Sequence, residues 1–257
     1  MRGKTAGTEK VGSFRFMYTE KFDIVFLSDT IQTKFPDMKS IAVILSGCGY
    51  LDGAEIRESV ATLWALSQHE VEVKIFAPDE PQLVVMNHFT GKATGDTRNM
   101  LAEAARIARG KIEPLSSLSD HDYDALIMPG GFGVAKNLCT FAAEGSAGSI
   151  LYKELLTDIT SMHADGRPIG AICIAPALIG LALKGKKLEL TLGADGNEAE
   201  EMRKLGHTHF VTNPNEIHID KTNKIVTTPA YMYDDAPIHE VFEGIKKLVN
   251  EVMEMAT

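Results

Sequence analysis

The chain has 257 residues, of which 44% are apolar and 24% are charged, and its formal net charge is −9. This length suits one medium-sized α/β domain, and the apolar fraction is sufficient for a substantial core. The acidic balance and the lack of a long Lys/Arg run argue against nucleic acid and anionic membrane surfaces as partners. No apolar stretch reaches the roughly 18 residues of a transmembrane helix, so we expect no membrane span.

The three cysteines, Cys48, Cys139 and Cys173, are odd in number and widely spaced. This pattern indicates neither a disulfide framework nor a zinc knuckle, and it favours a reducing compartment. The histidines lack a recognisable metal-binding spacing, and we expect no metal and no cofactor. We interpret "HTH" at 207–209 as a solvated strand start rather than a surface metal site.

The first 37 residues differ in character from the rest and are interpreted as an N-terminal extension, followed by a single domain over 38–257. The extension contains one candidate strand, "FDIVFLSDTI" at 22–31, but no long apolar segment with a small-residue cleavage site. Its acidic residues, Glu9, Glu20 and Asp23, count against a transit peptide.

From residue 41 onward, strand-like and helix-like patterns alternate. Short apolar or alternating runs predict strands at 41–47, 71–78, 124–131, 167–173 and 188–193, and a hairpin at 216–228. Helical spacing and Gly stops predict helices at 54–69, 97–110, 149–166, 175–183, 197–206 and 237–255. This alternation is typical of a mostly parallel sheet with helices on both faces, which binds ligands at the carboxyl ends of its strands.

The helix at 54–69 carries Ile56, Val60 and Leu63 near helical spacing, which predicts an apolar face. Asp52 and Glu55 have the spacing of an N-cap and an N3 residue in a capping box. A carboxylate at Glu55 would nevertheless point to the same sheet edge as Cys173, where it could be protonated and transfer a proton.

Cys173 stands where the strand at 167–173 meets the helix at 175–183. Its small neighbours Ala171 and Ala175 suit the sharp turn that presents a nucleophile, and Pro176 suits the first helical turn. A thiol at a helix N-terminus is expected to have a lowered pKa. The alternative is an ordinary buried cysteine, since free cysteine is one of the most buried residue types.

The glycine-rich stretch "PGGFG" at 129–133 follows another predicted strand. Glycines there would let backbone N–H groups approach a ligand, as an oxyanion hole requires, or would simply form a tight turn. We expect the N–H groups of Gly131 and Ile174 to hold an oxyanion. Cys48, Gly130 and Asn137 are further candidates for lining the same pocket.

Several long motifs resemble the enhancing-lycopene-biosynthesis family and its mitochondrial relatives, within the PfpI-like, class I glutamine amidotransferase-like superfamily. They are "AVILSGCGYLDGAEIRE", "NHFTGKATGDTRNMLAEAARIARG", "DALIMPGGFGVAKNL", "CIAPA" and "NKIVTTPAYM". The resemblance runs from about Met38 to the C-terminus. It implies a flavodoxin-like three-layer sandwich, a homodimer, Cys173 as the nucleophile of the elbow and Glu55 as its carboxylate neighbour.

The resemblance also implies a weak, cofactor-free glyoxalase, a lyase that converts the small dicarbonyl glyoxal into glycolate through a cysteine hemithioacetal. The link to isoprenoid biosynthesis is physiological and names no reaction. We expect a cytoplasmic location, with the mitochondrial matrix as the alternative.

Two other functions stay open at this point. One is a catalytically silent redox sensor or partner-binding protein, because an exposed thiol of low pKa oxidises readily. The other is a glutaminase subunit, which is disfavoured because Ile174 stands where many superfamily enzymes carry a His. The candidate His218 and Asp220 are interpreted as outward-facing positions of a hairpin strand.

Overall fold

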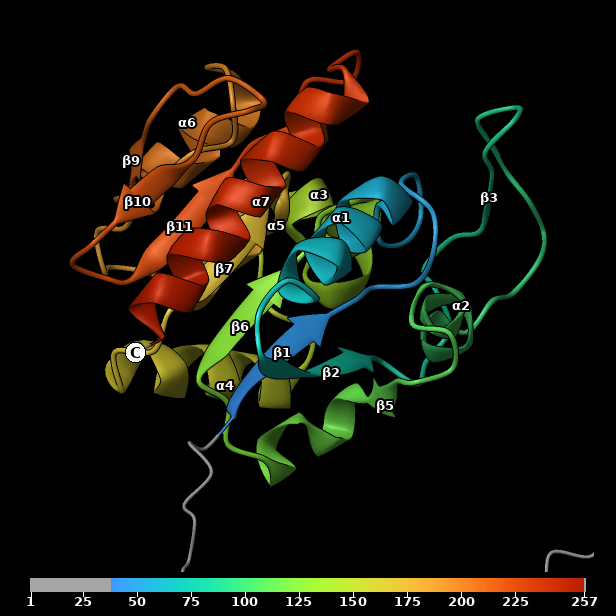
Figure 1. Ribbon diagram of the computed structural model, residues 1–257. Coiled ribbons are helices and arrows are strands. Elements are labelled where there is room, and N and C mark those ends of the chain that lie inside the picture. Colours follow the sequence, from blue (N-terminus) through green and yellow to red (C-terminus); the bar gives the residue numbers. More distant parts are fainter. Residues whose placement is uncertain (1–37, 257) are drawn as a thin grey trace, which may run out of the picture. The chain divides into compact units, whose positions relative to one another are not determined.

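The computed structural model describes residues 38–256, so the predicted extension over 1–37 and its strand at 22–31 lie outside the described residues. The domain is built on a seven-stranded sheet (Figure 1). Its strands, in spatial order, are β10 (His218–Asp220), β11 (Ile225–Thr228), β7 (Ile169–Ile172), β6 (Ala125–Met128), β1 (Lys39–Ile44), β2 (Val71–Ala77) and β5 (Glu113–Pro114).

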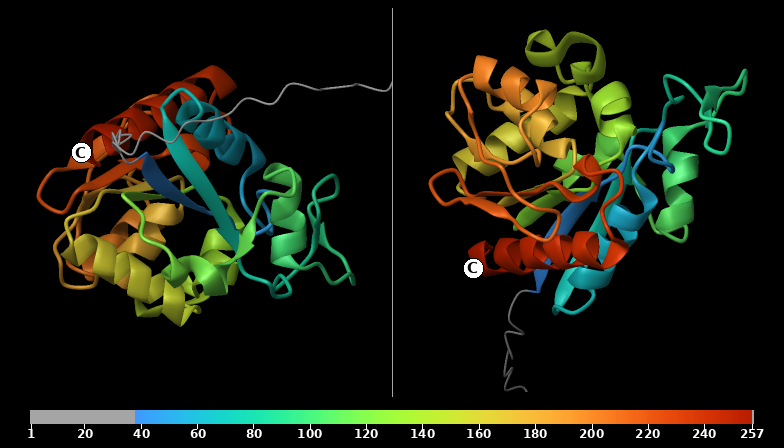
Figure 2. Two further views of the ribbon diagram at one scale, coloured as in Figure 1. Left: turned by 60° about the horizontal axis from the view of Figure 1, so that its bottom comes forward. Right: turned by 90° about the horizontal axis from the view of Figure 1, so that it is seen from above.

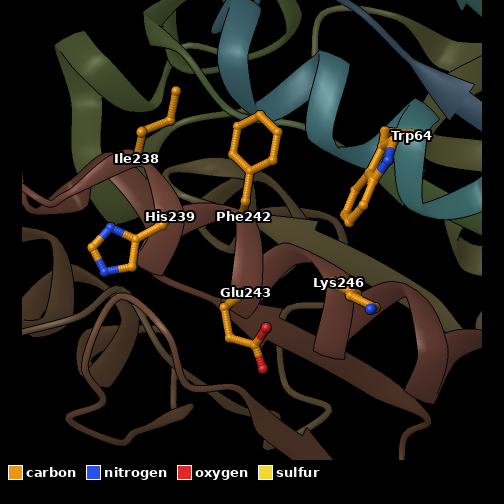
Figure 3. Close-up of a pocket in the computed structure, with 6 residues that line it drawn as sticks. All are labelled: Trp64, Ile238, His239, Phe242, Glu243 and Lys246. Atoms are coloured by element: carbon orange, nitrogen blue, oxygen red, sulfur yellow. The ribbon is translucent and has the colours of Figure 1, made fainter.

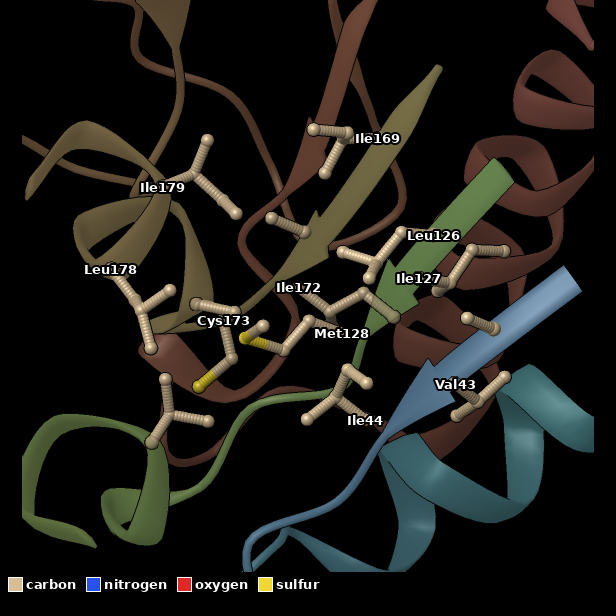
Figure 4. Close-up of a cluster of buried hydrophobic side chains, with 14 of the residues drawn as sticks. Val43, Ile44, Leu126, Ile127, Met128, Ile169, Ile172, Cys173, Leu178 and Ile179 are labelled. Atoms are coloured by element: carbon tan, nitrogen blue, oxygen red, sulfur yellow. The ribbon is translucent and has the colours of Figure 1, made fainter. Parts of the chain in front are cut away.

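All neighbouring strands of this sheet run parallel except the β10–β11 pair, which forms the predicted antiparallel hairpin. The central strands β6 and β7 are buried at every position, because helices cover both faces of the sheet. Their near-continuous apolar sequences therefore predicted them correctly. Figure 4 shows side chains of β1, β6 and β7 packed together in this core.

Helices cover the two faces of the sheet, as the two further views show (Figure 2). On one face, α1 (Ile56–Leu66) packs against α7 (Ile238–Met255), which also contacts β7 and β11. On the other face, α4 (Lys153–Ala164) and α5 (Ala175–Ala182) contact β7. The predicted α/β class, with a mostly parallel sheet between two helical layers, is confirmed.

The remaining elements are short and lie around this sandwich. They comprise α2 (Met100–Ile107), α3 (Phe141–Glu144), α6 (Asn197–Lys204), four short 3-10 or π turns, a two-residue hairpin β3 (Met86–Asn87) with β4 (Lys92–Ala93), and β8 (Glu189–Leu190) with β9 (Thr208–His209). The strand predicted over 188–193 is therefore shorter than expected, and it pairs with β9 outside the main sheet.

The chain reverses its direction of travel across the sheet between β1 and β6. From β1 it moves outward to β2, and it later returns to β6 and continues through β7 to β11. The loops that follow β1 and β6 therefore diverge at their carboxyl ends and leave a crevice there. Cys173 directly follows β7, the strand next to β6, so the topology brings the predicted site segments to one edge of the sheet.

The face of the first helix that the sequence predicted to be apolar and buried is largely exposed to solvent. Ile56 and Val60 are 45% and 46% exposed, whereas small residues such as Ala61 and Ala65 are buried. Because α1 packs closely against its neighbours, its inner face carries small side chains, and the larger apolar residues form a stripe on the outside. The helix also begins later than expected, with Glu55 and not Asp52 as its N-cap, so the predicted capping box is wrong.

The "HTH" stretch is not a solvated strand start. Both histidines are buried, and each accepts a hydrogen bond from a backbone N–H: Leu188 donates to Nδ1 of His207, and Leu192 donates to Nε2 of His209. Burial lowers the pKa of both imidazoles. They therefore serve as neutral acceptors that join β9 to the segment around β8.

Over 38–256, no helix has both the length and the apolar character that a bilayer crossing requires. In the same range, His, Cys, Asp and Glu side chains do not gather in threes or more at metal-binding distance.

Gly244 in α7 offers a test of this packing. An exposed helical Gly→Ala substitution is stabilising by about 1 kcal/mol. Here a Cβ would lie 2.3 Å from the Pro214 carbonyl oxygen and 2.8 Å from Oγ1 of Thr228. We expect Gly244→Ala to lower the free energy of unfolding by about 1 to 3 kcal/mol in urea titrations.

Ser161, which is exposed on α4, is the control, and Ser161→Ala should change the free energy of unfolding by less than about 0.5 kcal/mol. A stabilised Gly244→Ala variant would show that α7 does not approach the 214 loop this closely.

Candidate active site

Cys173 lies at the turn between β7 and α5, as Figure 4 shows. Its φ of 61° is in the left-handed region, which a residue with a side chain rarely adopts. The backbone N–H of Cys173 donates to the Thr228 carbonyl at 2.9 Å, which fixes the turn to the neighbouring strand β11. This strained, tightly held geometry is that of a nucleophile elbow.

The carboxyl group next to the thiol belongs to Glu58, on the first turn of α1. Glu58 is fully buried and is hydrogen-bonded to the sulfur of Cys173. Its Oε2 accepts the N–H of Gly130 at 2.9 Å, and its Oε1 accepts the N–H of Tyr231 at 3.2 Å. Four segments far apart in the sequence therefore meet at one carboxyl group.

Gly130 is needed where the thiol and the carboxyl group meet. A Cβ at this position would lie 2.4 Å from Cβ of Cys173 and 2.8 Å from Oε2 of Glu58. It would also lie 2.8 Å from the backbone oxygen of Ile172, which cannot move aside. The lack of a side chain at Gly130 lets the loop after β6 pass beside the pair and donate its N–H to Glu58.

Burial is the main cause that raises the pKa of Glu58, from 4.5 to about 8. The negative charge of Glu55 adds to the rise, and the two backbone N–H groups oppose it. The carboxyl group of Glu58 is therefore mostly protonated near neutral pH, so it can act as a proton donor.

The pKa of Cys173 is raised well above its usual value, first by burial and then by the charge of Glu58. The low pKa expected from the helix N-terminus is therefore wrong, because desolvation outweighs the helix dipole at a side chain that is only 7% exposed. Both the charge of Glu58 and its hydrogen bond with the sulfur therefore favour the protonated thiol.

Two backbone N–H groups act on the sulfur directly. Hydrogen bonds from Gly131 and Ile174 lower the pKa of Cys173 and partly offset the effect of burial. These are the two groups expected from the sequence to hold an oxyanion. Gly131 has a φ of 96°, and a Cβ there would lie 2.4 Å from the backbone nitrogen of Glu55, so this position also requires glycine.

The structure does not place Glu55 where the sequence analysis expected it. Its side chain accepts the N–H of Glu58 at 2.6 Å and so caps its own helix. Glu58 takes the place beside the thiol because it lies one turn further along, on the buried side of α1. Glu55 remains near the site and lines the pocket, and burial raises its pKa.

The sequence did contain a signal for Glu58. The buried positions of α1 include Glu58, Ala61, Thr62 and Ala65, which follow helical spacing. An acidic residue in line with small core residues indicates a buried carboxyl group. Ile56 and Val60 obscured this signal, because larger apolar residues are normally assigned to the inner face.

A pocket of about 950 Å³ opens in front of Cys173. Its lining comes from the loop after β1, the start of α1, the loop after β6, the elbow and the segments around 198 and 231–234: Tyr50, Leu51, Glu55, Ile56, Arg57, Gly131, Phe132, Cys173, Ile174, Glu198, Tyr231, Met232 and Asp234. Cys173 is thus buried in the protein but faces a space that a ligand can enter.

Three residues suggested for this pocket do not line it. Gly130 lies behind the thiol, against Glu58. Asn137 is buried and ties loops together, donating to the carbonyl groups of Ser46 and Asp52. Cys48 lies in the half-buried loop after β1, and burial raises the pKa of its thiol.

His218 and Asp220 also differ from expectation. Asp220 does not point outward but is buried, where it accepts the N–H groups of Glu189 and Asn223. The ring of His218 stacks on Phe210, with the ring centroids 4.0 Å apart. Neither residue lines the pocket in front of Cys173.

The chain is similar to known proteins over most of its length. The chain is 45% identical over 225 residues to the human glutamine amidotransferase-like class 1 domain-containing protein 3, mitochondrial, covering 84% of this chain and 82% of the human protein. It is 44% identical over 225 residues to a rat ES1 protein homolog, mitochondrial. That match covers 84% of this chain and 83% of the rat protein. No family model matches the chain.

Among solved structures, the fold resembles an isoprenoid biosynthesis protein with an amidotransferase-like domain from Ehrlichia chaffeensis. The TM-score is 0.79 at 34% identity, and the match covers 85% of this chain and all of the other. The parallel sheet and its elbow cysteine thus define a class I glutamine amidotransferase-like domain of flavodoxin-like architecture. More particularly, the chain belongs to the family of the mitochondrial glutamine amidotransferase-like class 1 domain-containing and ES1 proteins.

The buried carboxyl group predicts a pH dependence of stability. Glu58 has a higher pKa in the folded state than in the unfolded state, so its contribution is fully present below about pH 4.5 and is lost as the pH rises through about 8. In wild type this contribution lowers the free energy of unfolding by on the order of 3 to 5 kcal/mol between pH 5 and 9, and we expect Glu58→Gln to remove that decrease. Urea unfolding at several pH values measures it.

The quantity compared is the slope of the free energy of unfolding against pH. The absolute free energies differ, because an amide cannot accept both backbone N–H groups and Glu58→Gln is therefore less stable at low pH. Glu72→Gln, at an exposed position of β2, should keep the wild-type slope. Parallel curves for wild type and Glu58→Gln would contradict a buried, protonated Glu58.

Proposed function

We propose that the protein is a cofactor-free glyoxalase-like enzyme that converts glyoxal and water into glycolate. The observation that carries the proposal is the contact between Cys173 and a buried carboxyl group of Glu58 whose pKa is about 8, at the base of an open pocket. A nucleophile and a proton donor in contact are the groups that such a reaction needs.

In the first step, the sulfur of Cys173 attacks one aldehyde carbon of glyoxal, and the carbonyl oxygen takes a proton to give a hemithioacetal. The N–H groups of Gly131 and Ile174 would bind the oxygen while it is negatively charged. Glu58 accepts the proton that the thiol loses and passes it to the oxygen, in the role expected of Glu55, because Glu58 is the group in contact with the sulfur. Glu58 is then ionised and can accept the carbon-bound proton in the second step.

In the second step, the proton on the hemithioacetal carbon moves to the neighbouring carbon, and the hydroxyl proton of the hemithioacetal moves to the oxygen of that neighbouring carbon. One carbon is thereby oxidised to a thioester and the other is reduced to an alcohol, so no external oxidant or reductant is needed. Water then attacks the thioester, the carbon–sulfur bond breaks, and glycolate and the thiol are released. Glu58 is the group placed to move the proton between the carbons.

The other two functions have less support. A redox sensor is favoured by an exposed thiol of low pKa, whereas Cys173 is buried and its pKa is raised. A glutaminase of the usual kind needs a base beside the cysteine, and Ile174 occupies the adjacent position. The names of the human and rat relatives include the word mitochondrial, which favours a mitochondrial over a cytoplasmic location.

The activity test measures glycolate formed from glyoxal. We expect Cys173→Ser to reduce turnover to background, and Glu58→Gln to lower kcat by about 10²- to 10⁴-fold. Cys48→Ser, which lies outside the pocket lining, should stay within a few-fold of wild type. Glu55→Gln, which removes a charge that raises the pKa of Glu58, should lose less turnover than Glu58→Gln. Undiminished turnover by Cys173→Ser, or a larger loss in Glu55→Gln than in Glu58→Gln, would refute this assignment.

We further infer that the expected homodimer forms through the outer face of α1 and α7. Ile56, Val60 and Trp64 repeat every fourth residue on α1 and are 45–46% exposed, and Ile238 on α7 is 49% exposed. Figure 3 shows Trp64 facing Phe242 and other α7 residues.

The occupant best suited to this face is a second copy of the chain. Glu243 and Lys246 line the same hollow as Trp64, so the face carries both charges beside its apolar stripe. A two-fold axis places identical faces against each other, and opposite charges on one face can then pair across the interface.

The dimer test compares two apolar-to-acidic changes. Val60→Glu should shift the protein from dimer to monomer at micromolar concentration in light scattering, because a charge would be buried in the interface. Leu156→Glu, on α4 and 37% exposed, is the matched control and should stay dimeric. A monomeric wild type, or a dimeric Val60→Glu, would contradict this interface.

A further inference from the structure

The pocket in front of Cys173 is much larger than glyoxal needs. Its volume of about 950 Å³ is near the upper end of the roughly 300–1,000 Å³ that pockets for small molecules occupy. Aromatic side chains, Tyr50, Phe132 and Tyr231, supply much of its wall. The pocket can therefore hold a substrate with a longer body than two carbons.

Arg57 is the only positively charged residue lining this pocket in the described chain. The other charged side chains of the lining are Glu55, Glu198 and Asp234. A negatively charged group on a ligand inside the pocket would be repelled by those carboxylates and attracted to Arg57. The charges of the pocket therefore define a single position for an anionic group.

The guanidinium group of Arg57 is held in place by Tyr231. Its Nη1 donates to the Tyr231 hydroxyl at 3.1 Å, and its Cζ lies 5.7 Å from the centre of the Tyr231 ring. Within residues 38–256, no carboxylate oxygen lies within 4.0 Å of the guanidinium nitrogens. Glu55 acts on Arg57 only at longer range, since its own carboxylate is bound to the N–H of Glu58.

Tyr231 also connects Arg57 to the reacting groups. Its backbone N–H donates to Oε1 of Glu58, and Glu58 contacts the sulfur of Cys173. One residue thus holds the cation by its side chain and the proton donor by its backbone. The position of the anion site is therefore fixed relative to the thiol.

We propose that Arg57, positioned by Tyr231, binds a carboxylate on the substrate, and that the substrate is a dicarbonyl with its aldehyde at one end and a carboxylate at the other. This inference rests on the proposed glyoxalase reaction for the chemistry at Cys173. Guanidinium groups bind carboxylates through two parallel hydrogen bonds, which orient a ligand as well as hold it. The aldehyde end would then be directed to the thiol.

A suitable probe is 4,5-dioxopentanoate, in which an aldehyde and a ketone are adjacent and two methylene groups separate them from a carboxylate. The sulfur would attack the aldehyde carbon, the proton would move from that carbon to the ketone carbon, and water would cleave the thioester. The net reaction adds one water and yields a 2-hydroxy dicarboxylate and a proton, with one carbon oxidised and its neighbour reduced.

The first experiment compares this acid with its methyl ester, which has the same reacting end but no charge. We expect wild type to prefer the acid by about 10- to 100-fold in kcat/KM, as a charged hydrogen-bonded pair can supply. Arg57→Gln should lose this preference because its kcat/KM falls for the acid and not for the ester. Tyr231→Phe should show a smaller preference for the acid than wild type. Arg109→Gln, on an exposed arginine after α2, should behave as wild type.

Equal rates for acid and ester in wild type, or an equal loss of both in Arg57→Gln, would overturn the carboxylate site and leave the glyoxalase reaction standing. If wild type turns over none of glyoxal, the acid and the ester, the proposed reaction itself fails.

A second experiment tests the site without catalysis. Pentanoate, which is unreactive, should slow the alkylation of Cys173 by iodoacetamide in wild type, followed by mass spectrometry of the Cys173 peptide, and pentanamide should not. Arg57→Gln should lose this protection. Equal protection by the acid and the amide, or protection that persists in Arg57→Gln, would overturn the proposal even if turnover is observed.

Discussion

The organisation of the candidate active site depends on one carboxyl group that is buried and has no cationic partner within residues 38–256. Glu58 is stabilised by N–H groups from Gly130 and Tyr231 and by the thiol of Cys173, and burial raises its pKa to about 8. A charged carboxylate would be costly in this environment, so the group is kept as an acid. The loop after β6, the segment around 231 and the elbow are all positioned by their contacts with it.

This arrangement explains why two positions next to the thiol and the carboxyl group have no room for a side chain. Gly130 and Gly131 bring backbone N–H groups up to the carboxyl group and the sulfur, and a Cβ at either position would meet atoms at 2.4 Å. The strain at Cys173, with its φ of 61°, is maintained by the hydrogen bond to the Thr228 carbonyl. Rigid backbone and a buried proton donor together preorganise the groups before any ligand enters.

The outer part of the pocket differs from the inner part. The thiol and Glu58 are enclosed by backbone, whereas the mouth carries long side chains from α1 and from the 198 and 231–234 segments. The proposed reaction and the proposed substrate choice therefore depend on different residues, and Tyr231 connects the two groups. The exposed stripe of α1 begins at Ile56, which also lines the pocket, so an interface on that face would adjoin the pocket mouth.

The sequence alone determined the alternation of strands and helices, the parallel sheet and the position of Cys173 at a strand end, because apolar runs and glycine stops are local signals. It could not determine which glutamate meets the thiol, since Glu55 and Glu58 differ by one helical turn and only the packing of α1 decides which is buried. The sequence also led to the wrong direction for the pKa of Cys173, because it does not show how deeply the thiol is buried. A helix N-terminus is visible in a sequence, but burial depends on residues that are distant in the chain and adjacent only after folding.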